Sequence, residues 1–268
     1  MKLIDLDNNT RAPANHTSKG DQPKWELGGK WYKADHLGYE ALSEVLVSRL
    51  LEHSNATGYV SYAPVMICAD GKRLCGCVSR NFRGKDEALI PLEKLHRAYT
   101  GRGLASELSG MPEVSDRVKY TVEFVESKTG FTDFGRYLTL LLELDAFFLN
   151  EDRHTNNIAV IVNERTGKFR PCPIFDNGLS LLADVNDYPT HEDIFACIDR
   201  VKAKPFSQDF DEQVECAAAL YGPQLKFYFS RADVVAAMKD LGEYYTPEYL
   251  ERALDTITEQ MRKYKIYF

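Results

Sequence analysis

Two acidic residues and one amide, Asp152, Asn157 and Asp176, are the residues whose types and spacing most clearly suggest chemistry. Asp152 and Asn157 are five residues apart, and Asp176 follows nineteen residues later. Carboxylate and amide oxygens are ligands that Mg²⁺ prefers, and Mg²⁺ needs few of them because water and phosphate oxygens complete its octahedron. A second carboxylate can accept the proton of a substrate hydroxyl. The set therefore predicts phosphoryl transfer, with one carboxylate as base and the amide and other carboxylate on the ion.

A helix and a hairpin are predicted to bring these side chains together. Residues 138–149 are apolar at helical spacing, so a buried helix should lead into the first acid. Residues 158–162 and 169–175 are short β-prone runs, and Gly167 lies in the polar turn between them. Asp152 and Asn157 precede one strand and Asp176 follows its partner. The hairpin should therefore place all three at one end.

The first part of the chain predicts a small sheet with one helix. Strand-like segments surround an amphipathic helix at 36–53, whereas residues 1–14 are polar and without periodicity, and we expect them to be loosely ordered. The predicted strands are 25–27, 30–34, 59–68 and 73–78. From residue 83 the pattern becomes helical, with helices predicted at 89–100, 115–127, 133–149, 209–221, 230–241 and 246–264. We predict an α+β protein with an N-terminal lobe at 1–80, a hinge near 79–82 and a larger lobe at 81–268.

A lysine on a strand and glutamates on the following helix form a second candidate set. Lys33 lies on the strand at 30–34, and Glu40 and Glu44 lie one turn apart on the helix. Kinases hold the α- and β-phosphates with a strand lysine that reaches a helix glutamate. Such charges are usually solvated, and only the downstream acids favour the functional interpretation. Lys30 in place of Lys33, and Glu44 in place of Glu40, remain open.

Composition and charge limit the class of protein. The 268 residues are 44% hydrophobic, enough for a substantial core, and the net charge of −7 argues against a general nucleic-acid surface. Six cysteines show no zinc-binding spacing. No secretory signal is visible, and no apolar run approaches the about 18 residues of a membrane span. We expect a soluble cytoplasmic protein, although an exported effector would look the same.

The catalytic segment resembles a known family. Asp152-Arg-His-Thr-Asn-Asn157 is similar to the D-x-H-x-x-N loop of the HipA-like serine/threonine kinases, and Phe175-Asp-Asn-Gly178 stands where protein kinases have Asp-Phe-Gly. Gly20-Asp-Gln-Pro-Lys24 resembles the family's G-x-Q-x-K loop, which alone is a weak anion-binding signal. The resemblance runs from about residue 17 to 180. It implies a bilobal protein kinase-like fold, ATP and Mg²⁺ as cofactors and a protein substrate.

The resemblance also implies roles for individual residues. Asp152 would be the catalytic base, with His154 orienting the loop or approaching the phosphates, and Asn157 and Asp176 would bind Mg²⁺. Lys33, paired with Glu40, would contact the phosphates. The remaining nucleotide contacts would come from Thr17, Ser18, Lys19, Gly20, Gln22, Arg80, Asn81 and Phe82. In this family a hydroxyl of the glycine loop can be autophosphorylated, and Thr17 and Ser18 are the candidates.

Departures from the family and alternative functions limit these expectations. Asn150-Glu151 precede the catalytic acid where ordinary protein kinases have His-Arg, and there is no Ala-Pro-Glu motif. The N-terminal subdomain of longer HipA proteins is missing, which puts an antitoxin partner in doubt and indicates a compact single-module member. No direct nucleic-acid or membrane contact is expected. The alternatives are a pseudokinase scaffold of a toxin–antitoxin or effector system, or a lipid or small-molecule kinase.

Overall fold

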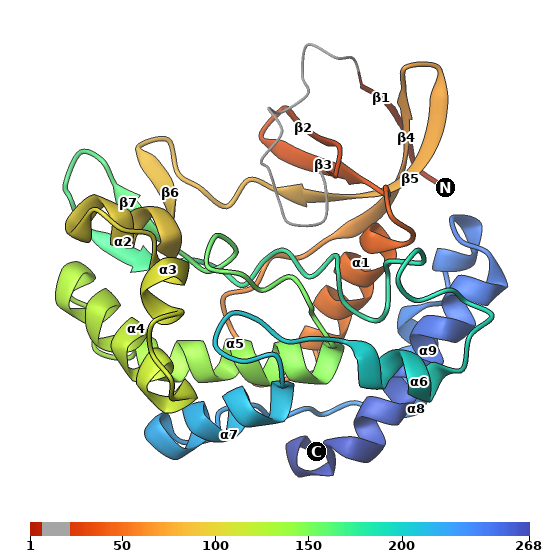
Figure 1. The fold of residues 1–268 in the computed structure, drawn as a ribbon. Coiled ribbons are helices and arrows are strands. Elements are labelled where there is room, and N and C mark those ends of the chain that lie inside the picture. The colour runs from red at the N-terminus through yellow and green to blue at the C-terminus, as the bar shows by residue number, and fades with distance from the viewer. Residues whose placement is uncertain (7–21) are drawn as a thin grey trace.

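A curled five-stranded sheet forms the smaller of two lobes (Figure 1). The computed structural model describes residues 1–6 and 22–268. The strand order is β1-β4-β5-β3-β2, with β1 parallel to β4 and the other neighbours antiparallel. The strands are β1 (Leu3–Asp5), β2 (Lys24–Leu27), β3 (Lys30–Ala34), β4 (Ala63–Ala69) and β5 (Lys72–Arg80). Gly28 and Gly29, at φ 59° and 71°, make the tight turn between β2 and β3, because both need positive φ.

One helix, α1 (Glu40–Leu51), connects the sheet to the larger lobe. Eleven of its twelve residues are buried, which agrees with its position between the sheet and the other helices (Figure 1). Its first turns are tied to a segment far along the chain, since the Tyr39 hydroxyl donates to the Leu181 carbonyl at 2.7 Å and the Ser43 hydroxyl donates to the Ser180 carbonyl at 3.0 Å. The helix therefore fixes the sheet relative to the segment that follows Asp176.

The larger lobe is mainly helical and is built around α5 (Phe134–Phe148). Twelve of the fifteen residues of α5 are buried, and α4, α7 and α9 pack around it. A small antiparallel sheet, β6-β7-β8, lies beside these helices (Figure 1). The other strands and α-helices are β6 (Glu87–Pro91), α2 (Leu92–Thr100), α3 (Leu104–Leu108), α4 (Val114–Thr129), β7 (Ala159–Asn163), β8 (Phe169–Pro171), α6 (Ile194–Arg200), α7 (Phe210–Tyr221), α8 (Arg231–Ala237) and α9 (Pro247–Lys263). Two short 3-10 helices are η2 (Leu241–Glu243) and η3 (Lys265–Tyr267).

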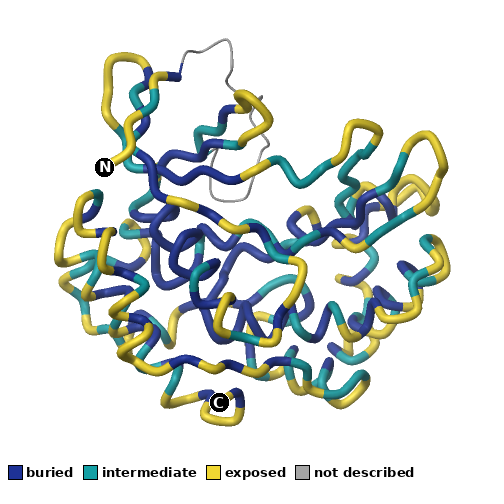
Figure 2. The backbone as a smooth tube through the Cα atoms, turned by 180° about the vertical axis from the view of Figure 1, so that it is seen from behind, coloured by how far each residue is buried: buried dark blue, intermediate teal, exposed yellow. Residues whose placement is uncertain are grey.

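The main hydrophobic core is continuous from α1 into the helical lobe. Residues of α1 and α5 belong to a single buried cluster, and a smaller cluster around Trp25 and Val78 fills the other face of the five-stranded sheet. From behind, buried backbone runs through the centre of the molecule, while exposed residues gather at the periphery (Figure 2). Within residues 1–6 and 22–268, no helix is both long and apolar enough to cross a membrane.

The α+β bilobal fold predicted from sequence is confirmed, with several local corrections. The β7–β8 hairpin, α5 and the start of α9 at Pro247 agree with prediction. Residues 3–5, expected to be loose, form β1 because β4 supplies their hydrogen-bond partners. Residues 87–91, expected to begin a helix, form β6 because they pair with β7. The short helices α3 and α6 were not predicted. Tertiary pairing decided the two strand corrections, and local periodicity does not report it.

Candidate active site

The side chain of Asn150 holds the two predicted acids at one place. The helix α5 ends at Phe148, and the next residue, Leu149, turns the chain out of the helix with a φ of 56°. The Asn150 side-chain amide then donates to the Asp176 carbonyl at 3.3 Å, and its oxygen accepts from the backbone N–H of Asp152 at 3.2 Å. A further bond, 3.0 Å to Asp145 Oδ1, fixes the amide itself. The backbones of Asp152 and Asp176 are therefore neighbours, as the hairpin prediction required.

Arg153 ties the loop containing Asp152 to the segment containing Asp176. Its side chain is buried, and its Nε lies 2.9 Å from Oδ2 of the equally buried Asp145. Its Nη1 donates to the carbonyls of Asn157 at 3.1 Å and Phe175 at 2.7 Å, and its Nη2 donates to Oδ1 of Asn177 at 2.9 Å. One guanidinium thus fixes both segments. The sequence reasoning missed this residue, although an Asp within an apolar helix followed by an Arg is a detectable signal.

The carboxylate of Asp152 faces two nitrogen groups. Lys204 Nζ donates to Oδ1 at 3.3 Å, and His154 Nε2 lies 3.7 Å from Oδ2. The other ring nitrogen of His154 accepts from the backbone N–H of Asn156 at 3.2 Å, which favours a proton on Nε2 when the ring is neutral. The Asn157 amide nitrogen donates to the Asp152 carbonyl at 2.9 Å. The amide oxygen of Asn157 is therefore the atom it can offer to a cation.

Lys33 joins the sheet, α1 and Asp176. Its ammonium donates to the carboxylate of Glu44 and, at 2.8 Å, to Oδ1 of Asp176, while Lys24 Nζ lies 4.0 Å from the same oxygen. The second oxygen of Glu44 accepts from the backbone N–H of Asn177 at 3.0 Å. Burial would lower the pKa of Lys33, but Asp176 and Glu44 outweigh it and raise that pKa well above its ordinary value. Lys33 is therefore a fixed cation.

The prediction that Glu40 pairs with Lys33 is wrong, and the alternative, Glu44, is the partner. The Glu40 carboxylate instead accepts from the backbone N–H groups of residues 36–38 at 2.7 to 3.2 Å, immediately before α1. These donors need an acceptor at a helix start, so Glu40 has a structural role. The alternative lysine, Lys30, lies three residues from Lys33 and therefore on the opposite face of β3.

Asp176 combines an unusual backbone with a stabilised negative charge. Its φ of 62° lies in the left-handed region, which Asp adopts more readily than most residues. Burial would raise the pKa of its carboxyl, but Lys24, Lys33 and Arg153 outweigh burial and hold the pKa below its ordinary value. The carbonyls of Asn157 and Phe175 both accept from Arg153 Nη1, so the segments that carry the Asn157 amide and the Asp176 carboxylate are neighbours. A carboxylate and an amide oxygen are hard-oxygen donors of the type that Mg²⁺ prefers.

The predicted adenine-bordering residues lie where β5 leaves the sheet. Arg80 ends β5, and the Asn81 backbone N–H donates to the Gly29 carbonyl at 2.9 Å. The ring of Phe82 lies 6.0 Å from that of Phe175, next to Asp176. The hinge segment therefore meets the predicted metal segment. Gln22 is half-buried. Thr17, Ser18, Lys19 and Gly20 lie outside the described residues.

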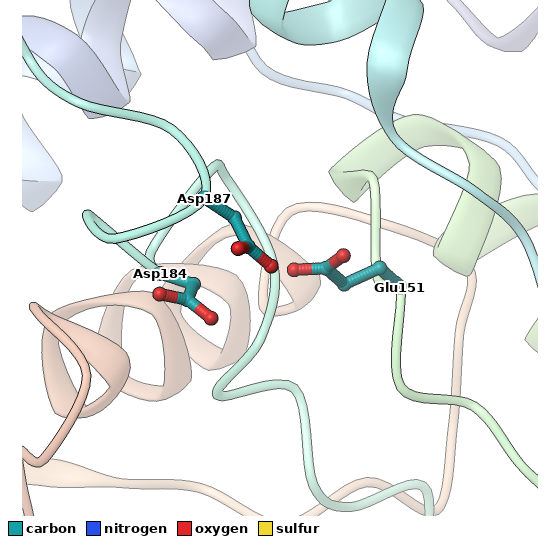
Figure 3. Close-up of side chains that lie close together, drawn as sticks. All are labelled: Glu151, Asp184 and Asp187. Carbon is teal, nitrogen blue, oxygen red and sulfur yellow. The ribbon is translucent and has the colours of Figure 1, made fainter. Parts of the chain in front are cut away.

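A separate group of carboxylates adjoins the loop. Glu151, Asp184 and Asp187 have oxygen atoms within 4.8 Å of one another, and Figure 3 shows them pointing together from two chain segments. Glu151 also accepts from the Tyr188 hydroxyl at 2.8 Å. The group contains none of the predicted metal ligands. Acidic side chains often gather without an ion, so we assign this group no ligand.

Solved structures of kinase-related proteins share this fold. The Helicobacter pylori proinflammatory kinase CtkA matches with a TM-score of 0.62 and 14% identity, over 97% of this chain and 94% of CtkA. A chain of the Shewanella oneidensis MR-1 toxin–antitoxin complex of HipA, HipB and operator DNA matches with a TM-score of 0.53 and 12% identity, over 96% of this chain and 66% of that chain. This chain has the HipA-like kinase fold.

The family resemblance seen in the motifs is thus confirmed at the level of the fold. No protein-family description matches the sequence, and neither does any curated protein. At 12% and 14% identity, the structural likeness does not by itself carry activity from one protein to another. Function must therefore be argued from the residues of the site.

Proposed function

We propose that this protein is an ATP- and Mg²⁺-dependent kinase that phosphorylates a serine or threonine hydroxyl of a protein. The observation that carries the proposal is the convergence of Asp152, Asn157 and Asp176 with the Lys33–Glu44 pair. A structural network would not require two carboxylates, an amide and a fixed lysine at one place. In this proposal residues 1–80 bind the nucleotide and residues 81–268 carry the catalytic loop.

Each residue has a role that follows from its chemistry. Asp152 accepts the hydroxyl proton as the hydroxyl oxygen bonds to the γ-phosphorus and the bond from phosphorus to the ADP oxygen breaks. Asn157 and Asp176 would hold Mg²⁺, which neutralises phosphate charge when bound. Lys33, oriented by Glu44, binds the α- and β-phosphate oxygens. Catalysis then consists of positioning and charge stabilisation.

The remaining predicted contacts complete the nucleotide site in this proposal. Arg80, Asn81 and Phe82 border the adenine, and the loop from Ser18 to Gln22, which lies outside the described residues except for Gln22, would lie over the phosphates. His154 supports the loop through its position 3.7 Å from Asp152 Oδ2. Thr17 or Ser18 is the proposed site of autophosphorylation. No direct contact with nucleic acid or membrane is part of the proposal.

Phosphate transfer can be tested with purified protein, labelled ATP and Mg²⁺, with mass spectrometry to locate any phosphate. Asp152→Ala should abolish transfer and leave nucleotide binding nearly intact, whereas Asp176→Asn should abolish transfer and weaken Mg²⁺-dependent ATP binding. Asp199→Asn, which changes an exposed residue of α6, is the matched control and should behave as wild type. Wild-type transfer by Asp152→Ala would refute the assignment. ATP binding that needs no Mg²⁺, without transfer, would indicate a pseudokinase instead.

A further inference from the structure

We propose that Lys204 is a further catalytic residue, whose ammonium group contacts the phosphoryl group as it passes to the hydroxyl held by Asp152. The proposal rests on the proposed kinase function and adds a residue that no sequence motif contains. Lys204 lies 52 positions after Asp152, in the segment between α6 and α7. The structure nevertheless places its Nζ 3.3 Å from Oδ1 of Asp152.

Lys204 is the more exposed partner of the base. Its side chain is 34% exposed, whereas that of Asp152 is 10% exposed. His154 faces the other carboxylate oxygen, Oδ2, at 3.7 Å. A hydroxyl that approaches Oδ1 therefore arrives beside the ammonium of Lys204. The Lys204 side chain is long and partly solvated, so it can move by about an ångström or two when substrate binds.

The segment that carries Lys204 is firmly held on both sides of it. The backbone N–H of Ala203 donates to the Gln208 carbonyl at 2.9 Å, which closes the segment on itself. Phe206 is fully buried, and its carbonyl accepts from Nη1 of Arg117 on α4 at 2.7 Å. The position of the Lys204 backbone is thus fixed by the core of the larger lobe. The packing of the larger lobe therefore places Lys204 near Asp152.

Distances in the transfer reaction bring the phosphorus within reach of this ammonium. A base lies about 2.6–3.2 Å from the hydroxyl oxygen whose proton it takes. The hydroxyl oxygen lies about 3–3.5 Å from the phosphorus before attack. One hydroxyl oxygen therefore separates the phosphorus from Oδ1 of Asp152, the oxygen that Lys204 contacts. In this proposal the lysine side chain rotates and exchanges this carboxylate for a phosphoryl oxygen.

Charge also gives Lys204 a role that Lys24 and Lys33 do not fill. Lys24 and Lys33 both face Asp176, on the side where the ATP phosphates would bind. Lys204 faces Asp152, on the side of the acceptor hydroxyl. Charge in the transition state is spread over the three equatorial phosphoryl oxygens, so a cation on the acceptor side stabilises it. Lys204 gives up no proton, because the hydroxyl proton passes to Asp152.

The first test compares Lys204→Met with Lys204→Arg and Lys202→Met. Loss of a preorganised charge at a transition state typically lowers kcat by about 10²–10³-fold, and we expect this for Lys204→Met. Lys204→Arg keeps the charge and should recover a substantial part of kcat. Lys202→Met removes an exposed lysine of the same segment and should match wild type. A kcat for Lys204→Met within twofold of wild type would overturn the proposal.

A second readout separates this proposal from the proposed kinase function. ADP with Mg²⁺ and aluminium fluoride mimics the phosphoryl group in transfer, and calorimetry can measure its binding. Lys204→Met should bind this mixture at least tenfold more weakly than wild type and bind Mg²⁺-ADP equally well. Suppose that wild type binds the mixture at least tenfold more tightly than Lys204→Met does, but transfers no phosphate. The proposed kinase function then fails, while the proposed Lys204 contact stands. Equal binding of the mixture by both proteins would refute the contact, since a merely structural lysine gives that result.

Discussion

Arg153 and Asp145 form a buried ion pair, with Nε 2.9 Å from Oδ2 and each side chain only 1% exposed. Arg153 also binds the carbonyls of Asn157 and Phe175, so the pair connects α5 to both parts of the candidate active site. Breaking a buried pair leaves one charge without its partner, which costs more than the pair itself contributes. The stability of the fold and the geometry of the site therefore depend on the same guanidinium.

Arg153→Met should lower the free energy of unfolding by about 3–5 kcal/mol, because Asp145 stays buried without its cation. Urea unfolding followed by circular dichroism measures this change. The double variant Asp145→Leu/Arg153→Met removes both charges and should recover part of the loss. The single variant Asp145→Leu gives the cost of the second mutation alone. If the double variant is less stable than Arg153→Met by that full cost, the two mutations are independent and the ion-pair explanation is contradicted.

Glu44→Gln should weaken Mg²⁺-ATP binding by about 10-fold or more, because a hydrogen bond to a charged group contributes about 1.5–3 kcal/mol. The amide cannot hold the Lys33 ammonium with the same charge. Glu40→Gln is the matched control one turn earlier on α1. It should cost roughly 1 kcal/mol of stability, as loss of a helix cap does, and leave ATP affinity unchanged. Equal effects of both variants on ATP affinity, measured by calorimetry, would exclude the Lys33–Glu44 role.

Asp176→Asn and Asp176→Val should differ in stability although both remove the carboxylate. Asn tolerates the left-handed backbone at φ 62°, whereas a β-branched residue there is strained by about 1–3 kcal/mol. Thermal or urea unfolding of the two variants measures the difference, and both should lose Mg²⁺-dependent ATP binding. Equal stability of the two variants would show that the positive φ does not constrain this position.

Glu87 should make the stability of the protein fall in acid. Its hydrogen bonds with the Arg170 side chain and the Gly84 N–H lower the pKa of Glu87 to about 2, below the value in the unfolded chain. A depressed pKa stabilises the fold above the unfolded pKa of about 4.3, and this stability is lost as pH falls toward 2. Urea unfolding between pH 2.5 and 5 should therefore give a shallower pH slope for Glu87→Gln. Arg170→Met should make the pH dependence of the unfolding free energy shallower in the same way. If both variants keep the wild-type pH dependence, Glu87 does not link stability to pH.

The sequence by itself determined the order of the elements and the main chemical candidates. Apolar periodicity located α1, α5 and α9, and Gly167 located the turn of the hairpin between β7 and β8. The spacing of Asp152, Asn157 and Asp176 around that hairpin predicted that they would meet, because a hairpin brings its two outer ends together. Each of these features depends on residues that are close in the sequence, so periodicity, turn residues and spacing are enough to predict it.

Only the tertiary structure decided which groups touch. Glu40 and Glu44 lie one turn apart on the same face of α1, so periodicity cannot say which of them meets Lys33; the docking of the helix on the sheet does. Strand β6 and strand β1 exist because neighbouring strands supply their hydrogen bonds. Lys204 lies 52 positions after Asp152 and reaches it through the packing of the larger lobe. Contacts between distant segments depend on how the elements pack in three dimensions, and a single sequence does not encode that packing in any local pattern.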